Sequence, residues 1–68
     1  MELTDQGSKK ILKWDINDLK EIKEARDIFF KYVKQGWIAA VHEDELKRVL
    51  KFSSSYGEIW FIPLAEGG

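Results

Sequence analysis

Residues 19–37, LKEIKEARDIFFKYVKQGW, determine the fold that the sequence predicts. At ~100° per residue, the apolar side chains gather on one broad face of a helix, and most charged side chains fall on the other. Gly36 is the residue type that commonly ends a helix in a left-handed conformation, so we expect the helix to end near Gln35. Ile28 falls outside the apolar face, which is formed by Leu19, Ile22, Ala25, Phe29, Phe30, Tyr32 and Val33.

The start of this helix is predicted from the polar residues that follow Trp14. Asp15 is the expected N-cap, because an Asp side chain accepts hydrogen bonds from the first free backbone N–H groups, and Asn17 is the alternative cap. With Asp15 as the cap, Trp14 and Leu19 have the spacing of a hydrophobic staple. Residues 11–14 form the one clear strand that is predicted before the helix.

Three more strands are predicted after the helix, at residues 37–41, 46–52 and 58–62. A polar break at residues 42–45 and a serine-rich loop at residues 53–57 separate them. The predicted order is therefore β-α-β-β-β, and the strand–helix–strand unit favours a right-handed crossover. We expect an α+β fold, a two-layer sandwich with one helix packed on a mixed three- or four-stranded sheet.

The length and composition indicate a single small globular domain. With 68 residues, 44% apolar and 34% charged, we expect one α+β domain at residues 11–64, a flexible N-terminal lead-in at residues 1–10 and a flexible tail at residues 65–68. The absence of Cys excludes a disulfide framework and fits either a reducing compartment or a high-temperature source. We expect a cytoplasmic protein. The sequence has no apolar run that could span a membrane and no apolar signal core, so no membrane partner is expected.

The predicted last strand is apolar on both faces, since Ile59 and Phe61 alternate with Trp60 and Ile62. One helix covers only one face of a sheet. The second face is therefore predicted to bind a protein partner or another copy, which makes the chain a non-enzymatic interaction or structural accessory module and a homo-oligomer. The alternative is a tightly wrapped monomer in which lysine stems shield that face. The candidate interface residues are Trp14, Trp37, Trp60 and Ile62.

Motifs for catalysis and for metal or cofactor binding are weak. Residues 42–45, His-Glu-Asp-Glu, contain metal-binding residue types, but neighbouring side chains in a short turn rarely face one ion, so a solvated turn is the favoured interpretation. Residues 53–55 are three serines without a nearby base, and the glycine-rich patterns of phosphate-binding loops are absent. No enzyme activity, metal or cofactor is expected.

Basic residues beside aromatic ones leave nucleic acid as an alternative partner. The net charge of −1, from 11 basic and 12 acidic residues, gives no support for it. Lysines that protect edge strands from aggregation would explain the pattern equally well. The residues concerned are Lys9, Lys10, Lys13, Lys47, Arg48 and Lys51.

The sequence ends in Gly67-Gly68, which follow the last predicted strand and Pro63. Two residues without side chains make a slim terminus that can enter the channel of an adenylating enzyme. In this tail the chain resembles ubiquitin-like sulfur carriers and modifiers, and the resemblance implies activation at Gly68. Those proteins have a β-hairpin before their helix, which this chain would match only if residues 1–4 pair with residues 11–14.

Residues 11–68 also resemble small uncharacterised proteins of phages, prophages and mobile elements. The shared pattern is a Trp-Asp start, a helix with a central Phe, a Gly-aromatic turn into a strand, and a closing apolar strand with Pro and Gly-Gly. The resemblance implies an accessory or structural role in a virus or its host, without a known activity. The matching residues are Trp14, Asp15, Ala25, Phe29, Gly36, Trp37, Ala39, Phe52, Ile59, Pro63, Gly67 and Gly68.

Overall fold

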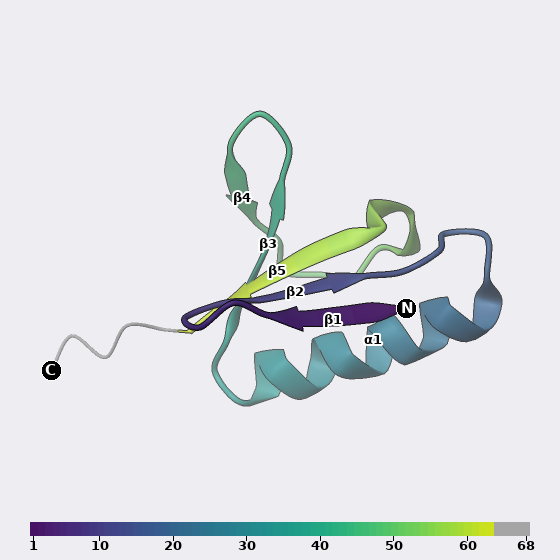
Figure 1. Ribbon diagram of the computed structural model, residues 1–68, viewed down its shortest axis with the longest axis horizontal. Coiled ribbons are helices and arrows are strands. Elements are labelled where there is room, and N and C mark those ends of the chain that lie inside the picture. Colours follow the sequence, from purple (N-terminus) through teal and green to yellow (C-terminus); the bar gives the residue numbers. More distant parts are fainter. Residues whose placement is uncertain (64–68) are drawn as a thin grey trace, which may run out of the picture.

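The computed structural model describes residues 1–63, which fold into one helix packed on a five-stranded sheet (Figure 1). The sheet order is β1-β2-β5-β3-β4, and every neighbouring pair of strands is antiparallel. The predicted α+β class is confirmed. The elements are β1 (Glu2–Asp5), β2 (Lys10–Lys13), α1 (Leu19–Lys34), β3 (Ile38–His42), β4 (Leu46–Arg48), a 3₁₀ turn (Ser54–Tyr56) and β5 (Glu58–Ile62).

The strand count and the sheet type differ from the prediction of a mixed three- or four-stranded sheet. Residues 2–5, which the sequence assigned to a lead-in, form β1 and pair with β2, so that a hairpin precedes the helix. The two strands that α1 connects, β2 and β3, are not neighbours, because β5 lies between them and is antiparallel to both. The observed order is therefore β-β-α-β-β-β, and no parallel pair occurs among the described strands.

Polar contacts hold the β1–β2 hairpin together. Gln6 donates its backbone N–H to the Lys9 carbonyl oxygen, and Gly7 donates to Asp5 Oδ1 across the turn. Lys10 Nζ lies 2.8 Å from Asp5 Oδ2. Leu3 pairs with Leu12 in the register of the two strands, but it is 41% exposed and is the only apolar residue within β1. β1 therefore carries little of the hydrophobic pattern by which a strand is recognised in a sequence.

Protonation of Asp5 is expected to weaken the hairpin. The hydrogen bond and the charge of Lys10 lower the pKa of Asp5 below its usual value of 3.8. A carboxyl whose pKa is lower in the folded chain contributes stability above the unfolded-state pKa, and loses that contribution as the pH falls through the folded-state pKa. An NMR titration of the Asp5 carboxyl carbon should have its midpoint below 3.8. A midpoint at or above that value, or one that Lys10→Gln leaves unchanged, would contradict the ion pair.

The helix starts three residues later than Asp15 would place it. Asp18 is the N-cap, since its Oδ1 accepts from the backbone N–H groups of Lys20 and Glu21 at 3.0 and 3.3 Å. Asp15 caps the preceding turn instead, where its Oδ1 accepts from the backbone N–H of Asn17. The predicted staple is absent from the described structure, because Trp14 is buried while Leu19 is 83% exposed.

The helix ends as the sequence predicts. Gly36 has a φ of +98°, which is the left-handed region that favours glycine. Its N–H donates to Val33 O, and the N–H of Trp37 donates to Tyr32 O, both at 3.0 Å. This pattern is a Schellman motif, in which the Tyr32 and Trp37 rings make the accompanying apolar contact at 5.5 Å between centroids. It directs the chain from α1 into β3.

The hydrophobic core lies between α1 and one face of the sheet. Phe29 is buried at the centre of α1, and its ring lies near those of Phe52 and Phe61, with centroids 5.7 and 6.3 Å away. The predicted strand at residues 46–52 is too long, because β4 ends at Arg48 and the chain then leaves the sheet. Leu50 consequently points to solvent, whereas Phe52 turns into the core. The buried cluster consists of Leu12, Trp14, Ala25, Phe29, Ala39, Val41, Ile59 and Phe61.

Candidate functional site

The helix presents more apolar surface than the sheet can cover. Ala25 and Phe29 are fully buried against the sheet, and Ile28, which the sequence placed outside the apolar face, also packs on the core. By contrast, Leu19 and Phe30 are 83% and 57% exposed. The predicted apolar face is thus divided into a part that packs on the sheet and a part that is exposed.

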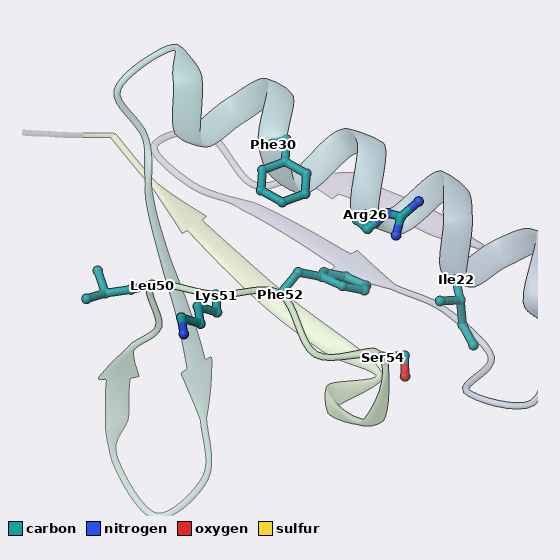
Figure 2. A pocket seen from close by; sticks show the side chains of 7 residues that line it. All are labelled: Ile22, Arg26, Phe30, Leu50, Lys51, Phe52 and Ser54. Carbon is teal, nitrogen blue, oxygen red and sulfur yellow. The ribbon is translucent and has the colours of Figure 1, made fainter.

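A groove lies beside this exposed part of α1 (Figure 2). One wall is the helix, and the other is the chain that leaves the sheet after β4. Its volume is about 440 Å³, within the range of ~300–1,000 Å³ that is usual for ligand pockets. Phe30 and Leu50, at 57% and 78% exposure, are the most exposed apolar side chains in the lining. We call this feature the helix groove; it is lined by Ile22, Arg26, Phe30, Leu50, Lys51, Phe52 and Ser54.

The charges of the helix groove have one sign. Arg26 on α1 and Lys51 on the facing segment carry positive charge, and no acidic residue lines the groove. Within residues 1–63, the ion pairs join Met1 to Glu21 and Lys10 to Asp5, so neither groove cation takes part in one. The helix groove therefore combines exposed apolar surface with two cationic groups.

The face of the sheet that lacks a helix has a different character. Trp60 lies at its centre, paired with Ile11 in β2 and with Ala40 in β3. Lys9 Nζ lies 4.4 Å from the centroid of the Trp60 ring, and the His42 ring stacks on that indole at 5.2 Å and 15°. Ile11 and Ala40, the strand neighbours of Trp60, are only 8% and 2% exposed. We call this surface the open face; its apolar residues are Ile11, Ile38, Ala40, Leu46, Trp60 and Ile62, of which Leu46 on the edge strand β4 is 43% exposed.

The four predicted interface residues do not lie together. Trp14 is buried on the helix side of the sheet, where its Nε1 donates to Ser54 O at 3.0 Å. Trp37 is half-buried on the same side, next to Tyr32. Trp60 and Ile62 lie on the open face and are half-buried. Of the four predicted interface residues, only Trp60 and Ile62 therefore lie on the open face.

Other candidate residues are also dispersed. The predicted basic set is divided, because Lys10 pairs with Asp5, Lys9 lies over Trp60, and Lys47 and Arg48 are exposed on the edge strand β4. Within residues 1–63, no group of three or more metal-ligating side chains is close enough to hold an ion. The predicted conjugation tail, Gly67 and Gly68, lies outside the described residues.

In the part of the chain that the structure describes, α1 is not long and apolar enough to cross a lipid bilayer. Comparison with protein-family models, with curated proteins and with solved structures found no match.

Proposed function

We propose that this chain is a non-enzymatic, cytoplasmic protein-interaction module and that its partner binds in the helix groove. The observation that carries the proposal is the exposure of Phe30 and Leu50 on opposite walls of one groove. Large exposed apolar side chains that line one groove are typical of protein-binding surfaces. The resemblance of residues 11–68 to small phage and prophage proteins supports an accessory role in a virus or its host.

The helix groove is favoured over the open face because of how each surface meets solvent. On the open face, the Trp60 ring already contacts Lys9 and His42, and its neighbours Ile11 and Ala40 are buried. Shielding of this kind supports the monomer that the sequence leaves as an alternative to an oligomer. A partner on the open face would have to displace these contacts, whereas a partner in the helix groove would meet Phe30 and Leu50 directly.

Site-specific photocrosslinking tests this proposal. A photoreactive phenylalanine analogue at position 30 should give a discrete adduct in an extract of the organism that encodes the chain. The matched control carries the analogue at Lys20, which is exposed elsewhere on α1 and does not line the groove. We expect an adduct from position 30 and none from position 20, and Leu50→Ser should reduce its yield.

The mass of the adduct identifies the kind of partner. A mass of twice the chain, about 16 kDa from a chain of 8.0 kDa, indicates a second copy, and any other mass indicates a different protein. Equal labelling from positions 30 and 20, or no adduct from position 30, would refute the helix groove as a binding site.

One observation favours a second candidate function, that of a ubiquitin-like carrier. The β1–β2 hairpin precedes α1, as a hairpin precedes the helix in those proteins. The sequence alone predicts only one clear strand before the helix, so this pairing supports the resemblance. Incubation with candidate activating enzymes and ATP, followed by intact-mass analysis, tests for an adenylated or conjugated Gly68. An unchanged mass with every such enzyme argues against this function.

Nucleic-acid binding is a third candidate, because Lys9 lies over the half-buried Trp60 ring. Aromatic rings next to cations can stack on bases and neutralise phosphates. Fluorescence polarisation with a labelled single-stranded oligonucleotide should then show binding that weakens as salt rises and that is lost in Trp60→Ala. Binding without salt dependence, or no binding at low salt, would exclude it.

A further inference from the structure

The lining of the helix groove restricts the chemistry of its partner, if the groove is the binding site proposed above. The apolar side chains there lie next to Arg26 and Lys51, and no carboxylate lies among them. Figure 2 shows Arg26 on the helix wall and Lys51 on the facing wall. From this arrangement we infer that the helix groove binds an acidic amphipathic helix of a partner protein, with apolar side chains in the groove and a carboxylate near Arg26 and Lys51.

Charge complementarity supports the acidic character of this partner. A purely apolar partner would bring two cations close to apolar surface without compensating them, and removing a cation from water without a partner is unfavourable. A carboxylate of the partner can accept hydrogen bonds from the guanidinium or from the ammonium group, and hydrogen bonds between charged groups are the stronger ones. A basic partner would be repelled by both groups.

The backbone around the groove supports a helical partner over an extended one. Strand addition needs an exposed strand edge with free N–H and C=O groups. The wall opposite α1 is not such an edge, because β4 ends at Arg48 and the lining residues Leu50, Lys51 and Phe52 are outside any strand. Recognition must therefore rely on side chains, and a helix presents apolar side chains at positions i, i+3, i+4 and i+7 along one face.

Selection of displayed peptides against the immobilised full chain tests the inference. The library holds helix-favouring peptides of about 16 residues with random apolar, acidic and basic positions. We expect the selected peptides to share an apolar face flanked by Asp or Glu, and to shift the NMR signals of Phe30, Leu50 and Phe52 on titration. Peptides that are enriched in basic residues, or a selection that yields no binder, would overturn the inference.

Substitutions on both sides locate the charge contact. In Arg26→Gln/Lys51→Gln, the dissociation constant of a selected peptide should rise about tenfold or more. The control Lys20→Gln/Lys31→Gln removes two exposed charges that do not line the groove, and it should leave the constant unchanged. Replacing the peptide's Glu by Gln should have the same effect as the groove variant, and combining the two changes should add little further loss.

The outcomes separate this inference from the proposed function. Peptides that shift the groove signals but bind the wild type and Arg26→Gln/Lys51→Gln equally well would overturn the acidic partner and leave the helix groove as a binding site. Peptides that shift the signals of Trp60 and Ile62 instead would contradict both. Circular dichroism shows whether each variant keeps its fold. We expect the spectrum of Arg26→Gln/Lys51→Gln to match that of the wild type, because both side chains are exposed.

Discussion

Replacing Phe29 by alanine is expected to lower the free energy of unfolding by about 3–5 kcal/mol, the usual range for removing a buried Phe ring. Phe29 is 1% exposed and lies between the rings of Phe52 and Phe61, so the substitution would open a cavity between α1 and the sheet. Small domains are typically stable by only about 5–15 kcal/mol. Urea denaturation followed by circular dichroism should therefore show a variant near the limit of folding.

Phe30→Ala is the matched control for this prediction. Phe30 is the next residue on the same helix, and it is 57% exposed. Its replacement by alanine removes the same atoms as the replacement of Phe29. Its ring contacts Phe29 edge-to-face at 5.3 Å, so the expected loss of stability is about 1 kcal/mol. Equal losses in the two variants would mean that the rotation of α1 on the sheet differs from the one described.

The second large effect is expected at Trp14. Trp14→Ala should lower the free energy of unfolding by about 3–5 kcal/mol. The indole is buried, lies 5.3 Å from the Phe52 ring between centroids, and donates a hydrogen bond to Ser54 O. It thus ties the segment before α1 to the segment before β5. Thermal or urea denaturation measures the change.

Trp60→Ala provides the comparison, because it removes the same side chain from the open face. Trp60 is only half-buried, and its loss should reduce the free energy of unfolding by about 1–2 kcal/mol. Trp14→Phe keeps an aromatic ring but removes the hydrogen bond to Ser54 O and part of the buried ring volume, and it should lose about 1–3 kcal/mol. If Trp60→Ala were more destabilising than Trp14→Ala, Trp14 would not have the core position assigned to it.

Local patterns in the sequence were sufficient for the elements with strong signals. Residues 58–62 are predicted as a strand and form β5 with the same bounds. Gly36 is predicted to end the helix and does so, because a left-handed residue followed by an aromatic one forms a Schellman motif without help from distant residues. The α+β class follows from these two elements.

Long-range contacts determine the parts that the sequence did not show. Residues 46–52 have the alternation of one strand, but Phe52 packs on Trp14 and Phe29, which are far away in the sequence, and the chain bends out of the sheet to make that contact. β1 has one apolar residue, Leu3, and is specified by its pairing with β2. Neither effect has a local signature.

The helix groove was missed for the same reason. The helical pattern places Phe30 on the face of α1 that packs on the sheet, because at ~100° per residue it lies beside Phe29. The helical pattern gives the width of the apolar face, but not how much of that face the sheet covers. Leu50 was assigned to a strand, and only the bend after Arg48 places it opposite Phe30. The width of the apolar face of α1 is the one feature of the sequence that indicates exposed apolar surface on the helix.

Paramagnetic relaxation of methyl groups by a neutral soluble probe tests the central claim most directly, namely that the apolar side chains of the helix groove are more accessible than those at the centre of the open face. We expect strong relaxation of the Leu50 methyls, which belong to a residue that is 78% exposed, and weak relaxation of the Ile11 methyls, where the exposure is 8%. Weak relaxation at Leu50 together with strong relaxation at Ile11 would contradict the claim.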